Sequence, residues 1–155
     1  MVPFIDAIKN DADAIMVGHL LIKDVDKRYP ASLSKRFIQK YLIEKYKYKG
    51  LIITDELKML AIQLHYSEKK AVEKAIEAGN DIIMIGLSTN RIRKIIKYII
   101  KKVQKGKIDI KRIEESAEKI ISMKEKYNVN DGKVTGVNIE EINNEIEQLN
   151  KKIMS

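Results

Sequence analysis

The sequence contains no cysteine and no tryptophan, and only two of its 155 residues are histidines. Without cysteine, neither a disulfide bond nor a thiolate metal site can form. The histidines, His19 and His65, do not have the HxH or HExxH spacing of a zinc motif. We therefore expect no bound metal, and no pattern in the sequence indicates an organic cofactor.

Long apolar runs are also missing. Nowhere do apolar residues continue for the roughly 20 positions that a membrane-spanning helix needs. Residues 1–6 have no basic segment leading into an apolar core, so they do not resemble a signal peptide. We expect a soluble protein without a membrane span, located in the cytoplasm.

Aromatic residues are few and basic residues abundant, since 30 lysines and arginines against 22 aspartates and glutamates give a net charge of +8. Such an excess raises affinity for polyanions. The basic residues are nevertheless spread over the polar faces of several expected helices, and no nucleic-acid-binding motif interleaves them with aromatics. We expect no specific nucleic-acid partner.

Short apolar segments alternate with amphipathic helical segments along the chain. Their length and β-branched residues predict buried strands at residues 12–19, 51–53 and 82–86. Helices are expected at residues 2–10, 35–46, 56–64, 68–78, 91–104, 110–126 and 139–153. This order is typical of an α/β barrel or open sheet, and three strands are too few to close a barrel of eight.

Local signals predict helix ends and buried helix faces. Ser34, Ser67 and Asp109 are expected to be N-caps, and Gly79 is expected to end the 68–78 helix. The 91–104 helix carries a continuous apolar stripe, formed by Ile92, Ile95, Ile96, Ile99, Ile100 and Val103. The 110–126 helix is expected to bury one side, formed by Ile113, Ala117, Ile120 and Ile121. The last helix carries a similar stripe and is interpreted as a packing helix or a contact with a partner.

The most informative stretch begins at Gly50. This glycine opens a short apolar strand, which stops at Thr54 and is followed by two carboxylates, Asp55 and Glu56. Because ligands bind at the carboxyl ends of parallel strands, Asp55 is a candidate for chemistry. Asp55 could instead be the N-cap of the following helix, which is the commoner role when this stretch is taken alone. Glu56 could accept hydrogen bonds from backbone N–H groups at the helix start.

This stretch resembles the nucleophile motif of glycoside hydrolase family 3, in which a glycine, three apolar residues, a serine or threonine and the catalytic aspartate follow one another. Here Gly50, Thr54 and Asp55 occupy the defined positions. The nearest branch is the β-N-acetylglucosaminidases that trim peptidoglycan fragments. In that branch an acidic residue, a leucine and a methionine come next, as they do in residues 56–59 (Glu-Leu-Lys-Met).

The resemblance extends from residue 2 to about residue 127. It includes residues 29–34 (Tyr-Pro-Ala-Ser-Leu-Ser) and 78–81 (Ala-Gly-Asn-Asp). Two positions depart from the branch, since an aspartate is usual in place of Glu56 and a basic residue is usual in place of Ile43. These departures concern the branch more than the family, because the nucleophile position is intact.

The resemblance implies an α/β fold that is the C-terminal portion of a (β/α)8 TIM-type barrel. About three parallel strands with crossover helices would be present, followed by C-terminal helices. Residues 1–127 would form this part of the barrel, and residues 128–155 would form a polar loop and a C-terminal packing helix.

The resemblance also implies a retaining β-N-acetylhexosaminidase that hydrolyses terminal β-N-acetylglucosamine from muropeptides. Asp55 would be the catalytic nucleophile, and His19 and Met59 would border the carbohydrate substrate. For His19, lining the site or bonding a backbone carbonyl is favoured over acting as the acid. The acid/base of this branch is a histidine paired with an aspartate on a mobile loop, and the chain has no counterpart of that segment. We therefore expect the chain alone to be inactive or nearly so.

A second hypothesis is a non-catalytic interaction module. A partial barrel leaves strand edges unpaired, and such edges bind other chains. The partner would be an unrelated protein, another copy of this chain in self-association, or an N-terminal half-barrel supplied separately.

Overall fold

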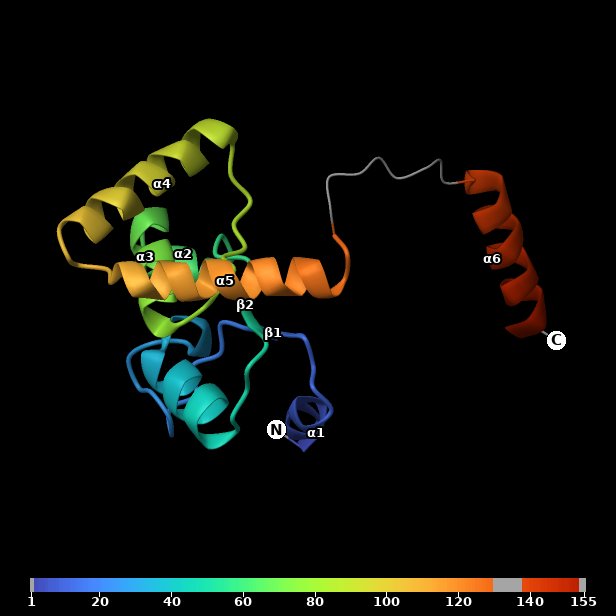
Figure 1. Cartoon of the computed structure of the whole chain (residues 1–155), viewed down its shortest axis with the longest axis horizontal. Helices are drawn as coiled ribbons and strands as arrows, with labels where there is room; N and C mark the ends of the chain where they lie inside the picture. The colour runs from blue at the N-terminus through green and yellow to red at the C-terminus, as the bar shows by residue number, and fades with distance from the viewer. Residues whose placement is uncertain (1, 130–137, 154–155) are drawn as a thin grey trace.

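The computed structural model describes residues 2–129 and 138–153 (Figure 1). Two parallel strands, β1 (Ala14–Val17) and β2 (Leu51–Thr54), lie at its centre and pair in register from Ala14 with Leu51 to Val17 with Thr54. The crossover between them contains η1 (Ala31–Leu33) and η2 (Arg36–Lys45). This strand, helix, strand unit confirms the predicted α/β class, although most of the chain is helical.

The predicted third strand is present only as an irregular segment. Ile82 forms an isolated parallel bridge with Ile53, and the backbone N–H of Thr54 donates to the carbonyl of Ile82 at 3.0 Å. Residues 82–87 run beside β2 without forming a strand, and Met84 is 39% exposed, so the prediction of a buried strand is wrong. A strand needs a regular ladder, and among the described residues no further strand pairs with the outer edge of this segment.

Helix η2 begins where the sequence places a serine. The hydroxyl of Ser34 accepts a hydrogen bond from the backbone N–H of Phe37 at 3.0 Å, as an N-cap side chain does. The helix is wound as a π-helix, and its wider turn is visible in the 3.1 Å bond from Tyr46 N–H to the carbonyl of Tyr41, five residues earlier. Its buried face, which includes Ile38, packs with β1 and β2 in one apolar cluster.

The remaining helices follow the predicted order. They are α1 (Val2–Lys9), α2 (Leu60–Gln63), α3 (Glu68–Ala78), α4 (Thr89–Gln104), α5 (Ile110–Lys126) and α6 (Ile139–Ile153). Asp109 caps α5 by accepting from Lys111 N–H at 3.0 Å, and Gly79 ends α3 at a φ of +114°, as predicted. Ser67 precedes α3 as predicted, but its side chain makes no capping hydrogen bond.

The predicted burial of one side of α5 is wrong, and the apolar stripe of α4 is mostly not buried. Only Ile95 is buried on α4, and no residue of α5 is buried. A stripe shows which face of a helix is suited to packing, but burial also requires a neighbouring element that covers that face. Figure 1 shows α6 lying away from the other helices, and its apolar residues are all exposed. No helix in the described ranges combines the length and apolar character needed to cross a bilayer.

The carboxylate of Asp81 joins α5 to β2. This side chain is fully buried and accepts a hydrogen bond from the backbone N–H of Ile52 at 3.0 Å. It also accepts from Arg112 Nη2 at 2.6 Å, Ser116 Oγ at 2.8 Å and Lys119 Nζ at 3.3 Å. These contacts hold α5 across the strands, as Figure 1 shows, and thereby position the strand that carries Asp55.

Gly50 is required by a close backbone approach. A Cβ atom at this position would lie 2.6 Å from the carbonyl oxygen of Asp13 and 2.4 Å from the hydroxyl of Tyr48. The same carbonyl accepts the first bond of the strand pairing, from Leu51 N–H at 2.8 Å. The glycine of the motif therefore lets β2 start beside β1.

Glu73 of α3 is a buried carboxylate with three donors. Lys70 and Lys102 donate from their ammonium groups, at 3.0 and 2.9 Å, and Tyr98 donates its hydroxyl at 2.6 Å. Burial alone would raise the pKa of Glu73, but these hydrogen bonds outweigh it and hold the pKa at about 2, below its ordinary value of 4.5. Glu73 thus ties α3 to α4.

The lowered pKa of Glu73 predicts an acid-sensitive contribution to stability. Because the folded state binds the proton more weakly than the unfolded state, the contribution is complete above about pH 5 and is lost as the pH falls toward 2. We expect the wild type to lose about 2 kcal/mol more unfolding free energy than Glu73→Gln between pH 6 and pH 3. Urea titrations of both proteins at the two pH values measure the difference, and equal losses would contradict the prediction.

Candidate active site

Three parallel segments bring their carboxyl ends to one edge of the structure. The backbone N–H of Asp55, after β2, donates to the carbonyl of Val17 at the end of β1, at 3.0 Å. The backbone N–H of Gly86, after the third segment, donates to Glu56 Oε2 at 2.8 Å. His19, two residues beyond β1, contacts the carbonyl of Glu56. The residues that the sequence singled out after different strands therefore lie together.

Asp55 is not a helix N-cap. Its Oδ1 atom accepts from the next backbone N–H, that of Glu56, at 2.8 Å, whereas α2 begins only at Leu60 and is preceded by Met59. The side chain is half-buried, and no described residue donates a hydrogen bond to its Oδ2 atom. One oxygen is thus held in place while the other is available to a ligand at the strand end.

The Glu56 carboxylate is occupied by backbone N–H groups. Lys58 N–H donates to Oε1 at 2.8 Å, as the sequence predicted for a residue that holds this turn. Gly86 N–H donates to both oxygens, at 3.1 and 2.8 Å, and this contact with a segment 30 residues away could not be read from the sequence. Glu56 therefore ties the turn after β2 to the end of the third segment.

His19 is hydrogen-bonded through both ring nitrogens. Nε2 lies 3.0 Å from the carbonyl oxygen of Glu56, and Nδ1 lies 2.7 Å from the hydroxyl of the fully buried Ser32. Because a carbonyl only accepts, Nε2 carries the hydrogen, and in the neutral ring Nδ1 accepts from Ser32. The predicted bond to a backbone carbonyl is present. Contact of His19 with a sugar stays a prediction.

Met59 lies on the same turn as the carboxylates. Its backbone N–H donates to the carbonyl of Glu56 at 3.0 Å, and its side chain is 46% exposed. A thioether exposed to this extent can contact a ligand, and the role of Met59 as a sugar contact stays a prediction. His65, the other histidine, follows α2 and is exposed.

A cavity of about 970 Å³ lies elsewhere, between residues 23–29, η2 and the end of α3. Neither Asp55, His19 nor Met59 lines it. Within the part of the chain that the structure describes, no three side chains of histidine, cysteine, aspartate or glutamate converge in a way that would hold a metal ion. We call the strand-end cluster of Asp55, Glu56, His19 and Met59 the ledge.

The fold and the ledge define a class: an incomplete parallel α/β domain with a carboxylate displayed at the carboxyl end of a strand. Within that class the chain belongs to glycosyl hydrolase family 3, because the model of the Glycosyl hydrolase family 3 N terminal domain matches residues 1–123. This match includes all the residues of the ledge.

Similar proteins cover most of this chain, but the chain covers only part of them. It is 29% identical over 120 residues to an uncharacterized secreted glycosyl hydrolase of Arthroderma benhamiae, covering 77% of this chain and 34% of that protein. It is 32% identical over 83 residues to a beta-hexosaminidase of Hydrogenovibrio crunogenus, covering 54% and 23%. A family 3 beta-N-acetylglucosaminidase from Paenibacillus sp. str. FPU-7 superposes with a TM-score of 0.81 at 30% identity, covering 87% and 26%.

The chain thus spans about a third or less of the length of these relatives. What the complete proteins do therefore bears on this chain only as a basis for a proposal.

Proposed function

We propose that this chain supplies the nucleophile of a retaining β-N-acetylhexosaminidase. The observation that supports the proposal most directly is Asp55 itself, which is held at a strand end by one oxygen and free at the other. The family membership and the relatives named beta-hexosaminidase support the reaction class. The substrate would be a terminal β-linked N-acetylglucosamine, for which we propose a muropeptide as the source.

In a retaining mechanism the nucleophile attacks the anomeric carbon while a second group protonates the leaving oxygen. The Asp55 carboxylate would form the C–O bond of a glycosyl-enzyme, and water activated by the second group would then break it. Glu56 and His19 are poor candidates for that second group, because their polar atoms are already bonded within the chain. They would instead hold the turn on which Asp55 sits, while Met59 borders the sugar.

The missing acid/base would come from an N-terminal half-barrel that completes a (β/α)8 barrel with residues 1–127. Exposed apolar side chains favour such a completion: Met16 on β1 is 56% exposed, Leu20 after it is 72% exposed, and Met84 lies on the open edge. Further parallel strands, added beside β1 and beside segment 82–87, would cover these side chains and enclose the ledge. Residues 128–155 would lie outside the barrel.

Mixing this chain with an N-terminal half-barrel from a related family 3 enzyme tests the proposal. We expect neither half alone to hydrolyse a chromogenic N-acetylglucosaminide and the mixture to turn it over. General acid catalysis contributes roughly 10² to 10⁴-fold to the rate. The difference in rate between this chain alone and the mixture should therefore be smaller with a dinitrophenyl glycoside, whose leaving group needs no proton.

The second candidate function, a non-catalytic binding module, is favoured by the same exposed edge. It predicts that the two halves associate in a pull-down or by calorimetry but produce no turnover with either leaving group. Association without hydrolysis would therefore replace the enzymatic proposal with the binding one.

A further inference from the structure

An apolar groove lies between α3, α4 and α5, away from the candidate active site. It encloses about 460 Å³, and nine of its ten lining residues are apolar. Ile96 and Ile100 on α4 are about half exposed there, as is Ile110 on α5. No residue of β1, β2 or segment 82–87 lines the groove, so it is distinct from the edge where further barrel strands would add.

Helix α6 carries an apolar stripe with no partner in the described part of the chain. The stripe consists of Ile139, Ile142, Ile146, Leu149 and Ile153, and the least exposed of these residues is 45% exposed. Their spacing of three and four places them on one face of the helix. An isolated helix of 15 residues is marginal in water, so α6 needs a surface to pack against.

We propose that the groove binds α6 of a second copy of this chain, and that two copies exchange their α6 helices reciprocally. In the structure α6 lies away from the groove of its own chain, so both surfaces are open at once (Figure 1). In a two-fold dimer the α6 stripe of each copy fills the groove of the other copy, so the same contact forms twice.

The lengths of the two surfaces match. Helix α4 has 16 residues and α6 has 15, so both are about 22 to 24 Å long at 1.5 Å per residue. The α5 residues in the groove, Ile110 and Ile113, lie in the first turn of α5, whereas the chain leaves α5 at its other end, after Lys126. The connection to α6 therefore starts at the end of α5 that is farther from the groove.

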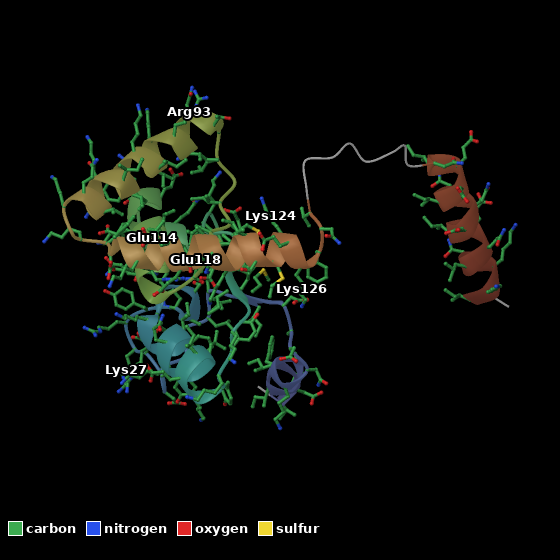
Figure 2. The ribbon with its side chains drawn as sticks, in the orientation of Figure 1. Lys27, Arg93, Glu114, Glu118, Lys124 and Lys126 are labelled. Atoms are coloured by element: carbon green, nitrogen blue, oxygen red, sulfur yellow. The ribbon has the colours of Figure 1, made fainter. Side chains whose placement is uncertain are left out.

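The charges of the two helices are complementary. Helix α4 has six basic residues and no acidic residue, and Figure 2 shows Arg93 at its N-terminal end. Helix α6 has four glutamates in its first nine residues, followed by two lysines in its last turn. Whether α6 lies parallel or antiparallel to α4, its mainly acidic side chains would face a helix whose charged residues are all basic. This complementarity favours α6 over the α4 helix of a second copy as the occupant of the groove.

Light scattering across a dilution series of residues 1–155 tests the exchange. We expect the mass to rise from the 17.9 kDa monomer to twice that value with concentration. Ile146→Asp places a charge in the apolar contact and should weaken the dimer by about 30-fold or more. Asn144→Asp adds the same charge on the opposite face of α6 and should leave the dimer nearly unchanged. Because both residues are exposed in the monomer, neither variant should unfold the rest of the chain.

Thiol cross-linking identifies the occupant of the groove, since the chain has no cysteine of its own. Chains carrying Ile100→Cys and chains carrying Ile146→Cys, mixed with a short bismaleimide, should give a linked dimer containing one of each. A linked monomer from the double variant at high dilution would show that each α6 occupies its own groove and would overturn the exchange. A monomer at all concentrations, or a dimer insensitive to Ile146→Asp, would overturn it as well.

Discussion

Replacing Asp55 by asparagine is expected to reduce turnover in the reconstituted barrel by roughly 10⁴-fold or more, the size of loss that follows removal of a catalytic nucleophile. The amide keeps the size and shape of the side chain, and its oxygen can still accept the hydrogen bond from Glu56 N–H. What it loses is the carboxylate that attacks the anomeric carbon. Initial rates on a chromogenic N-acetylglucosaminide, at saturating N-terminal half, measure the effect.

Glu56→Gln is the matched control for Asp55→Asn, because it neutralises the adjacent carboxylate. The glutamine retains one oxygen for Lys58 N–H or Gly86 N–H, so we expect a loss of no more than about 10²-fold, through poorer positioning. A fluoro-substituted N-acetylglucosaminide with an activated leaving group should trap the glycosyl-enzyme on Asp55, as read by peptide mass mapping. If the label is found on Glu56, or if Glu56→Gln loses more activity than Asp55→Asn, the nucleophile has been assigned to the wrong residue.

Replacing Asp81 by alanine is expected to lower the free energy of unfolding by about 3 kcal/mol. The change removes the acceptor of the backbone N–H of Ile52 and the buried carboxylate that pairs with Arg112. The Arg112 guanidinium keeps the backbone carbonyls of Gly79 and Asn80 as acceptors. Breaking a buried ion pair usually costs about 3 to 5 kcal/mol. We expect the lower end of this range, because Arg112 and Lys119 remain 19% and 33% exposed and regain some hydration.

Urea unfolding followed by circular dichroism measures this loss. Asp24→Ala removes the same group from an exposed site and should change the free energy by less than about 0.5 kcal/mol. Similar values for the two variants would show that the contacts of Asp81 do not hold α5 to β2. If Asp81→Ala does not fold, the milder Ser116→Ala removes one donor and should cost about 1 kcal/mol.

Local chemistry explains which elements the sequence predicts well. Ser34, Asp109 and Gly79 act on backbone groups within a few residues of themselves, and all three lie at the helix ends that the sequence indicates. The parallel pairing of β1 with β2 also follows, because a strand, helix, strand unit almost always forms that way.

Predictions that depended on distant partners were less successful. The stripe on α4 has the spacing of a buried face, yet Ile96 and Ile100 are about half exposed because no element among residues 2–129 and 138–153 covers them. Segment 82–86 has the composition of a buried strand, but within the described part of the chain no strand pairs with its outer side. The composition of a segment indicates which kind of neighbour it can pack against, but it does not show whether that neighbour is present.

The sequence by itself determined the α/β order of elements, the helix ends at Ser34, Gly79 and Asp109, and the position of Asp55 directly after an apolar strand, since these depend on interactions between near neighbours. Only the tertiary structure decided that Asp55 is not a helix cap, that Glu56 bonds to Gly86 N–H and His19 to the Ser32 hydroxyl, and that Asp81 joins α5 to β2. These roles depend on hydrogen bonds between groups far apart in the chain, and no local pattern specifies which donor a buried carboxylate will meet.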